Sequence, residues 1–396
     1  MTVTRVEFNP FLPEVLENPF PLYHRLRTED PVHESPLGLW VLTRYDDIAS
    51  MLRDARFGRK GFDALLQGRF GEAGFDLSML FRDPPDHTRL RALVSRAFTP
   101  RAVEEMRARI QGIVDALLDH AQDVGRMDVI ADLAYPLPVI VICEMLGVAA
   151  EDRDLFRHWT VDIARSLDAI SLRTEPEVIE RGTAARHALA DYFRGLIAER
   201  RHRPRADLLS ALIAAEEQGD KLTEGELMAT VLLLFVAGHE TTVNLIGNGT
   251  LALLRYPAEL RALQANPALI GSAVEELLRY DGPVQRTSRM PHTDVELGGK
   301  TIPKGAVVLG LIGAANRDPA HFPDPDRLDI TRSDNRHLGF GGGIHFCLGA
   351  PLARLEAQIA ILALVRRMDR LALATARPEW RQSSALRGLM ALPVTF

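Results

Sequence analysis

Cysteine is scarce in this sequence, since its 396 residues contain only Cys143 and Cys347. Two cysteines cannot build a disulfide framework, and their wide separation does not match the CxxC pairs of a structural zinc site. A chain with so few cysteines has no need of an oxidising compartment. We therefore expect the protein to work in the reducing cytoplasm.

Signals for nucleic acids, membranes and export are also missing. The net charge is −6, whereas proteins that bind nucleic acids usually carry a basic excess. Apolar runs such as residues 231–237 are far shorter than the roughly 20 residues that span a bilayer. Residues 1–20 contain acids and prolines where a signal peptide has a basic patch and an apolar core. We expect no nucleic-acid partner and no membrane anchor.

Helical periodicity dominates what is present. Apolar residues recur at three- and four-residue steps in the segments 99–118, 137–147, 151–169, 177–202, 206–217, 223–255 and 267–280. The segment 223–255 would be about 50 Å long at 1.5 Å per residue, and Thr223 is its expected N-cap. Extended hairpins are expected at 31–45 and 295–305, and a long loop at 57–75.

These patterns predict a mainly α fold with a minor β portion. No internal repeat and no linker divides the chain, so we expect a single domain over residues 1–396. Its β-containing part lies at about 30–60, and its helical core lies at about 85–280.

The segment GFGGGIHFCLGA, residues 339–350, places Cys347 between a glycine-rich turn and the expected start of a helix. Glycine lets a large group approach the backbone closely, and the amides of a helix N-terminus favour a thiolate. Three interpretations remain open from this segment alone. Cys347 is a buried structural residue, a nucleophile with His345 as its base, or the thiolate ligand of a haem iron.

The long helix contains AGHETT, residues 237–242, in its interior. Glycine costs a helix interior about 1 kcal/mol, and the Thr241 hydroxyl can bond to the carbonyl of Ala237. The result is either a groove lined by a hydroxyl and a carboxylate or simply a kinked buried helix.

Two charged pairs occur at helical spacing. Glu276 and Arg279 are three residues apart and form an ion pair on one helix face, which is usually a surface feature. His87 and Arg91 are four residues apart, and together they either hold carboxylates or form a solvated basic face.

GFGGGIHFCLG resembles the haem-ligand loop of the cytochrome P450 family, whose pattern is Phe-x-x-Gly-x-His/Arg-x-Cys-x-Gly. The fixed positions are matched by Phe340, Gly343, His345, Cys347 and Gly349. The other three patterns occur upstream in the family's order, and the resemblance extends from about residue 9 to residue 396. It implies the cytochrome P450 fold, in which haem b lies between a long distal helix and a proximal cysteine loop, here 339–350, with Cys347 as the iron ligand.

The resemblance also implies roles for residues outside this loop. Dioxygen would lie in a groove beside Ala237 and Gly238, and protons would reach it through Glu240 and Thr241. The haem propionates would be held by His87, Arg91, Arg289 and His345. A buried structural network would contain Glu276, Arg279 and Arg327. Besides the loop 57–75, the substrate pocket would be lined by Leu233, Val236, Ala237, Val284, Thr287, Leu389 and Met390.

The implied activity is that of a bacterial haem-thiolate monooxygenase, an oxidoreductase that inserts one oxygen atom of O₂ into a C–H or C=C bond of a hydrophobic small molecule. The chain has no GxGxxG fingerprint after a strand, so electrons from NAD(P)H are expected through a separate ferredoxin and its reductase. These would dock near Cys347, where Arg89, Arg96 and Arg354 are expected to contribute positive charge. We expect a monomer.

Three alternatives belong to other classes. A peroxide-using haem-thiolate enzyme would share the ligand loop but tends to lack the acid and the alcohol that are present at positions 240 and 241. A haem sensor would bind the same cofactor without catalysis. A thiol hydrolase would contain no haem at all.

Overall fold

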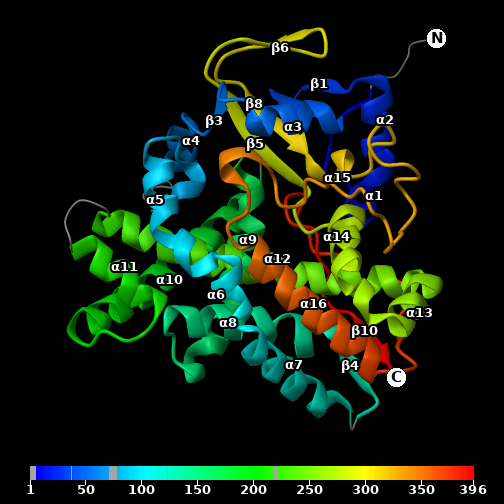
Figure 1. The fold of residues 1–396 in the computed structure, drawn as a ribbon. Helices are drawn as coiled ribbons and strands as arrows, with labels where there is room; N and C mark the ends of the chain where they lie inside the picture. The colour runs from blue at the N-terminus through cyan, green and yellow to red at the C-terminus, as the bar shows by residue number, and fades with distance from the viewer. Residues whose placement is uncertain are drawn as a thin grey trace.

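The computed structural model describes residues 6–36, 38–70, 78–122, 124–170, 172, 174–217 and 222–396. Helices form most of it, and the largest sheet lies at one end of the molecule (Figure 1). The α-helices are α1 (Pro13–Glu17), α2 (Phe20–Glu29), α3 (Tyr45–Arg53), α4 (Phe62–Phe70), α5 (Asp86–Ser95), α6 (Pro100–Glu104), α7 (Arg107–Gln122), α8 (Pro136–Leu146), α9 (Phe156–Ser166), α10 (Pro176–His202), α11 (Leu208–Glu217), α12 (Glu224–Arg255), α13 (Pro257–Ala265), α14 (Ile270–Asp281), α15 (Ile312–Ala315) and α16 (Ala350–Arg367).

Short helical turns and strands connect these helices. The turns are η2 (Met79–Phe81), η3 (Arg96–Phe98), η4 (Ile130–Ala134), η5 (Ala150–Leu155), η6 (Leu167–Ile170), η7 (Pro267–Leu269) and η8 (Gly343–His345). The strands are β1 (Val32–Ser35), β2 (Leu39–Leu42), β3 (Phe57–Gly58), β4 (Arg126–Asp128), β5 (Arg286–Pro291), β6 (Val295–Leu297), β7 (Lys300–Ile302), β8 (Val307–Leu311), β9 (Ala372–Leu373) and β10 (Pro393–Thr395).

The long helix α12 runs through the middle of the helical part (Figure 1). It begins at a capping box, in which the Thr223 hydroxyl accepts the N–H of Glu226 at 3.2 Å and the Glu226 carboxylate accepts the N–H of Thr223 at 2.9 Å. By length and composition α12 could cross a bilayer, but 83% of its most apolar window is buried inside the protein. Helix α12 is therefore a buried core helix of this protein.

Helix α16 carries the cysteine loop to the centre of the molecule. Pro351 lies in its first turn, where the missing N–H breaks no helical bond. The helix packs against α12, α7 and α14. This packing holds the N-terminus of α16, and the loop before it, beside the middle of α12.

The main sheet has the strand order β1-β2-β8-β5-β3. Strands β2 and β8 are parallel, and the other neighbours are antiparallel. Residues two apart on a strand share a face, so Thr287 and Arg289 of β5 point to the same side. A second sheet, β4-β10-β9, joins the C-terminal strands to a strand that follows α7.

Most of the predicted elements are confirmed by the structure, and one is wrong. The long helix, its cap and the hairpins at 31–45 and 295–305 are present. The loop predicted at 57–75 instead contains β3 and α4, while residues 71–75 lie outside the described part. Helix α4 forms because Phe62 and Leu66 pack in a buried cluster with Phe81 of η2, which outweighs the weak helical periodicity of a glycine-rich segment.

Candidate active site

A cavity of about 330 Å³ lies where α12, α5, β5 and the loop before α16 meet. The residues that line it come from all of these elements and from the segments around them. Among them are Arg59, Met79, Leu80, His87, Arg91, Leu233, Ala237, Gly238, Thr241, Thr242, Val284, Thr287, Arg289, Phe340, His345, Cys347 and Gly349.

Cys347 lines this cavity from the turn before α16. Its N–H donates to the carbonyl oxygen of Phe340 at 3.0 Å, which closes the loop. Gly343 has a φ of +65°, and a Cβ at this position would lie 2.1 Å from the carbonyl oxygen of Leu52. Both the backbone conformation and the close approach exclude a side chain there. The glycines thus let the loop fold tightly against α3.

The surroundings of Cys347 shift the pKa of its thiol in opposite directions. Burial raises the pKa of its thiol, because a thiolate loses its hydration. The amides of Gly349 and Ala350 and the charges of Arg91 and Arg354 act to lower the pKa. A thiolate at this position therefore has amide donors and two cations to stabilise it once a metal replaces the proton.

Among the described residues, five basic side chains converge on the cavity: Arg59, His87, Arg91, Arg289 and His345. The ring centroids of His87 and His345 are 4.4 Å apart. The motif that contains His87 and Arg91 therefore meets the cysteine loop in the folded protein. Burial lowers the pKa of all five groups, and repulsion from neighbouring cations lowers it further at Arg59, His87 and His345. The pKa of Arg289 falls to about 10 and that of His345 to about 2.

This cluster fits an anionic ligand. Arg59 Nε and His345 Nε2 are buried and have no hydrogen-bond partner among the described residues. Asp83 is a described carboxylate whose charge acts on the cluster, and it already accepts the backbone N–H groups of Arg59 and Lys60. Two further carboxylates would satisfy these donors, and a thiolate on the same cavity would bind iron. The residues present therefore fit a haem with its two propionates.

Arg59 is the member of this cluster that the sequence analysis missed. It lies just after β3 and is buried, and its guanidinium lies 5.5 Å and 5.9 Å from the ring centroids of Phe62 and Phe81. Its segment showed no periodicity that relates it to the other four basic residues. Because the segment 57–75 was predicted as a loop, nothing in the sequence distinguished Arg59 from the arginines expected at the surface.

The interior of α12 has the hydroxyl of the predicted groove but not its carboxylate, because Glu240 does not line the cavity. The Thr241 hydroxyl donates to the carbonyl of Ala237 at 3.1 Å, and both residues line the cavity together with Gly238. A Cβ on Gly238 would lie 3.3 Å from side-chain atoms of Ile142, so the helices approach closely here. The cavity wall therefore contains the Thr241 hydroxyl and, at Gly238, a stretch of helix without a side chain.

Glu240 lies differently from Thr241. Its side chain is buried and paired with Arg381 of the C-terminal segment, and it is not among the residues that line the cavity. The second carboxylate oxygen, Oε2, has no partner among the described residues. The acid is thus held next to the groove, on the side of the helix that faces Arg381.

A second acid lies behind the groove. Glu356 of α16 is 1% exposed and is hydrogen-bonded to Thr242, which itself lines the cavity. Burial raises the pKa of Glu356 to about 8, because the hydrogen bond from Thr242 only partly offsets the desolvation of a carboxylate. The carboxyl group is therefore largely protonated at neutral pH.

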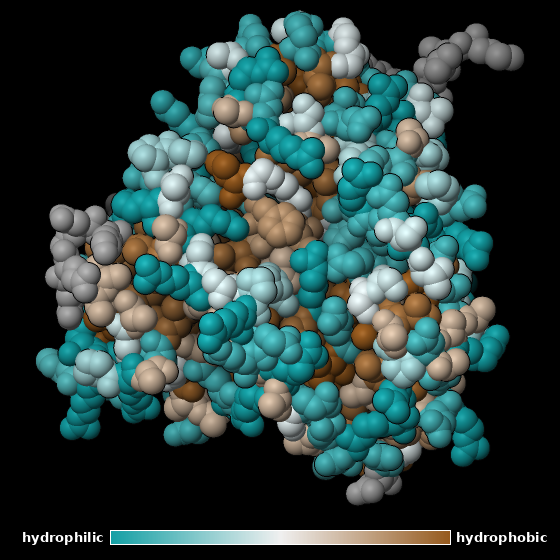
Figure 2. Space-filling model, viewed as in Figure 1, coloured by the Kyte–Doolittle hydropathy of each residue, from teal (hydrophilic) through white to brown (hydrophobic). Residues whose placement is uncertain are grey.

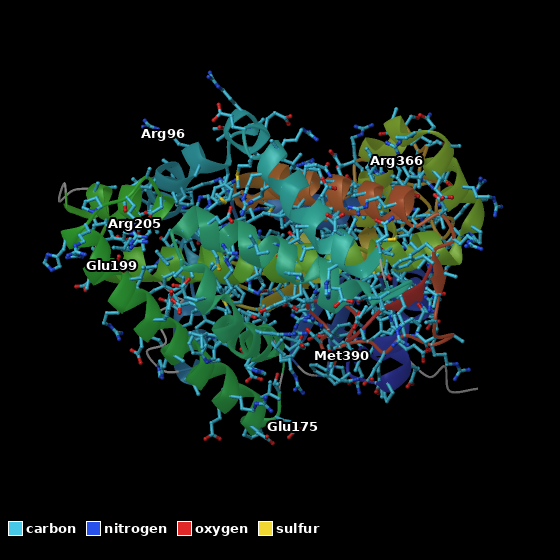
Figure 3. All side chains as sticks on the ribbon, turned by 90° about the horizontal axis from the view of Figure 1, so that it is seen from below. Arg96, Glu175, Glu199, Arg205, Arg366 and Met390 are labelled. Atoms are coloured by element: carbon cyan, nitrogen blue, oxygen red, sulfur yellow. The ribbon has the colours of Figure 1, made fainter. Side chains whose placement is uncertain are left out.

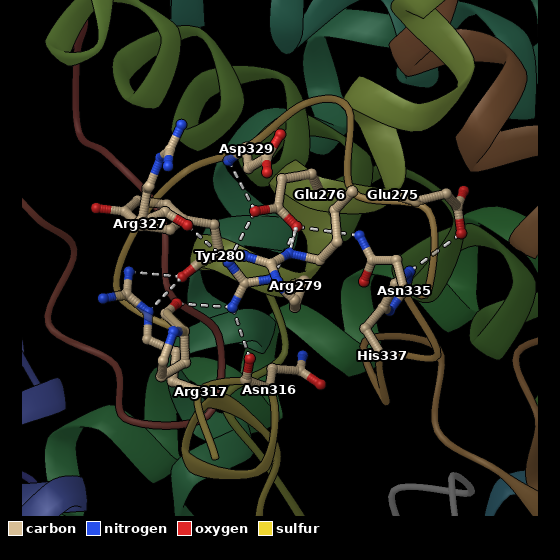
Figure 4. Close-up of polar contacts among 12 residues, drawn as sticks. Glu275, Glu276, Arg279, Tyr280, Asn316, Arg317, Arg327, Asp329, Asn335 and His337 are labelled. Atoms are coloured by element: carbon tan, nitrogen blue, oxygen red, sulfur yellow. Dashed lines mark hydrogen bonds and ion pairs between the residues drawn. The ribbon is translucent and has the colours of Figure 1, made fainter. Parts of the chain in front are cut away.

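Glu276 and Arg279 form a buried network rather than a surface pair (Figure 4). Two parallel bonds of 2.7 and 2.8 Å join them, and Arg279 also donates to the carbonyl oxygens of Asn316, Pro325 and Arg327. Both side chains are fully buried, so the pair fixes the irregular segment that precedes the cysteine loop.

The prediction that the side chain of Arg327 completes this network is wrong. Arg327 contributes only its carbonyl oxygen, and its side chain is exposed. Arg332 is the arginine that pairs with Glu276, at 3.2 Å, and Asn335 donates to the same carboxylate at 3.1 Å. In an irregular segment no periodicity tells which of two arginines turns inward, and the chain path decides it.

The predicted substrate-pocket residues divide into two groups. Leu233, Ala237, Val284 and Thr287 line the cavity. Val236 and Leu389 are buried but do not line it, and Met390 is 56% exposed. Figure 3 places Met390 at the surface, on the side opposite to Arg96. Leu389 is drawn into the core by a bridge to Trp380, which turns the next residue outward.

The arginines expected to form a basic docking face are largely neutralised. Arg89 pairs with Glu226, and Arg354 pairs with Glu275 through two bonds. Arg96 is exposed at the surface (Figure 3). The positive charge near Cys347 is therefore smaller than the sequence suggested.

Comparison with known proteins gives consistent matches over the whole chain. The family model described as Cytochrome P450 matches residues 35–371. The biotin biosynthesis cytochrome P450 of Bacillus subtilis (strain 168) is 44% identical over 388 residues, which cover 97% of each chain. The vitamin D(3) 25-hydroxylase of Pseudonocardia autotrophica is 44% identical, covering 96% of this chain and 94% of the hydroxylase.

Among solved structures, myxobacterial cytochrome P450 CYP267B1 in complex with myristic acid has a TM-score of 0.91 and 48% identity, covering 98% of each chain. Family, fold and enzyme class predicted from the motifs are therefore confirmed. The family implies a haem cofactor and the use of O₂, in agreement with the donor set of the cavity. The chain belongs to the cytochrome P450 family and is a monooxygenase, an oxidoreductase of bacterial type.

Proposed function

We propose that Cys347 is the iron ligand of a haem b and that the five basic side chains of the cavity hold its propionates. The observation that supports this most strongly is the shared cavity: Cys347, the basic cluster and the Thr241 surface of α12 come from distant segments and line one space. A bound haem supplies the dioxygen chemistry that inserts one oxygen atom into a C–H or C=C bond.

The residues of this chain bind, orient and supply protons. Amides of the α16 N-terminus and two arginines stabilise sulfur as an anion. We assign proton transfer to Thr241 at Oγ1, which lines the cavity. Glu240 is adjacent in sequence, and its oxygen Oε2 is buried without a partner among the described residues. Ala237 and Gly238 leave the space in which dioxygen is held.

The substrate is a hydrophobic small molecule. Apart from the basic cluster, the cavity is lined mostly by apolar side chains such as Met79, Leu80, Leu233 and Val284. The relatives support this assignment, because CYP267B1 was solved with myristic acid and another relative is a vitamin D(3) 25-hydroxylase.

Electrons come from NAD(P)H through a separate ferredoxin and its reductase, which dock on the face next to Cys347. Ile344 and Phe346 are 50% and 41% exposed there. Arg91 donates to the carbonyl oxygen of Phe346 at 2.7 Å, and Arg96, five residues after Arg91, is exposed. Figure 2 shows hydrophobic side chains among hydrophilic ones near the middle of this face, where Figure 1 shows the loop that leads into α16. We also propose that the protein is a monomer and works in the cytoplasm.

The reduced protein with carbon monoxide tests the iron ligand. Cys347→Ser should abolish the absorption typical of thiolate-bound haem, whereas Cys143→Ser should keep it, because Cys143 is buried in the core and does not line the cavity. An identical spectrum in both variants would refute the assignment. Purified protein without pigment would refute it as well.

Two further measurements test the reaction. A panel of hydrophobic compounds should shift the spin state of the ferric haem, and Val284→Trp should weaken this response by filling the cavity. Product should form with O₂, ferredoxin and reductase. Formation with peroxide alone would favour the peroxide-using alternative, and substrate binding without any product would favour a haem sensor.

A further inference from the structure

A group of charged and aromatic side chains lies next to the cysteine loop, and of its members only Phe340 is among the residues that line the cavity. It consists of Glu275 on α14, Arg354 on α16, and His337 and Phe340 in the segment before Cys347. We refer to these four residues as the proximal cluster.

Glu275 binds two partners at once. Its carboxylate accepts Arg354 Nε at 2.7 Å and Nη2 at 2.8 Å, and it contacts His337 Nε2 at 3.1 Å (Figure 4 shows the contact with His337). Burial alone would raise the pKa of Glu275, but the bonds from Arg354 and His337 outweigh it and lower the pKa to about 2. The carboxylate is therefore charged at any working pH.

Hydrogen bonds at both ring nitrogens orient His337. Its Nδ1 accepts the backbone N–H of Gly339 at 3.0 Å, so the ring proton lies on Nε2 and is donated to Glu275. The proximal cluster thus contains one negative and one positive charge.

Both partners of Glu275 contact the ring of Phe340. The guanidinium carbon of Arg354 lies 4.5 Å from the ring centroid, and the ring of His337 lies 6.0 Å from it. The carbonyl oxygen of Phe340 accepts the N–H of Cys347. Arg354 also stabilises the thiolate of Cys347 by its charge. Glu275 therefore acts on Cys347 through Arg354 and Phe340, without touching either sulfur or cavity.

We propose that Glu275 is a positioning residue that sets the reduction potential of the haem held by Cys347, by fixing Arg354 over Phe340 and balancing its charge. The proposal rests on the proposed ligation by Cys347. Reduction adds one electron to the site, and a nearby unbalanced cation favours it while an unbalanced anion opposes it. In the wild-type protein the charges of Glu275 and Arg354 have opposite effects on the reduction potential, and these effects nearly cancel.

The test is a spectroelectrochemical titration of the substrate-free holoprotein at fixed pH and salt. Glu275→Gln leaves the charge of Arg354 unbalanced, so the potential should become more positive. Arg354→Gln leaves Glu275 unbalanced, so the potential should become more negative. The double variant should return toward the wild-type value, and Arg354→Lys should stay near it because the charge is kept.

Glu144→Gln is the matched control, because Glu144 forms the same two-bond pair with Arg109 but does not line the cavity. Its potential should be unchanged. The reduced carbon monoxide spectrum of each variant confirms that the thiolate is intact.

Shifts in the same direction, or no shift, in Glu275→Gln and Arg354→Gln would overturn the proposal and leave the cluster a purely structural one. If Glu275→Gln does not fold, a negative shift in Arg354→Gln with none in Arg354→Lys still supports the proposal, and its absence refutes it. Failure of the proposed function is seen separately, as a wild-type protein without haem or a spectrum unaffected by Cys347→Ser.

Discussion

The buried acid Glu356 predicts an unusual pH dependence of stability. Its pKa is about 8 in the folded protein, against an ordinary value of 4.5. Between these pH values the folded chain keeps a proton that the unfolded chain releases, so the free energy of unfolding falls as pH rises. Each pH unit costs about 1.4 kcal/mol, which amounts to about 4 kcal/mol between pH 5 and pH 8.

Glu356→Gln removes this dependence, because glutamine is neutral at every pH and can still hydrogen-bond to Thr242. The stability of the variant relative to wild type should therefore increase by about 4 kcal/mol from pH 5 to pH 8. With an unfolding entropy of about 2 cal/mol/K per residue, the change corresponds to about 5 °C in Tm. Other titrating groups are the same in both proteins, and their contributions cancel in the difference.

Urea unfolding followed by circular dichroism at pH 5, 6, 7 and 8 measures this difference. Glu14→Gln is the matched control, since Glu14 is exposed on α1 and should show the wild-type pH dependence. A difference between Glu356→Gln and wild type that stays constant over this range would refute the reasoning. Glu356→Leu should show the same loss of pH dependence as Glu356→Gln, because leucine carries no titratable group.

The buried network of α14 gives the next prediction: Arg332→Ala should destabilise the protein by about 2 kcal/mol, whereas Arg327→Ala should cost about 0.5 kcal/mol or less. Equal losses in urea unfolding would contradict the assignment of Arg332. Arg59→Gln should accelerate haem transfer to apomyoglobin several-fold while Lys60→Gln does not, and equal transfer rates would remove Arg59 from the propionate site. Thr241→Val should keep the haem spectrum but lower the product formed per O₂ consumed, and an unchanged ratio would show that the hydroxyl supplies no proton.

Local patterns in the sequence were sufficient for much of the fold. The capping box at Thr223 and the apolar content of α12 depend on residues close together in the chain, and the helix starts where they predicted. Helix α4 was missed because its stability comes from Phe81 and other partners that are distant in sequence. Propensity carries no information about such partners.

The candidate site shows the same division. Cys347 and its glycines are recognisable because the tight turn and the thiol belong to one short segment. Arg59, Arg332 and Arg381 were missed or misassigned because each reaches its partners from a separate segment. A single arginine in an irregular segment carries no local sign of the side to which it turns.

The sequence by itself determined the helical character, the turn that presents a cysteine and the polar groups at fixed steps along α12. These features depend on backbone sterics and short-range spacing. Only the tertiary structure decided which charges share a space: the basic cluster around the cavity, the pairing of Glu240 with Arg381 and the neutral state of Glu356. Electrostatic energies depend on distance and burial, and neither can be read from the order of residues in the chain.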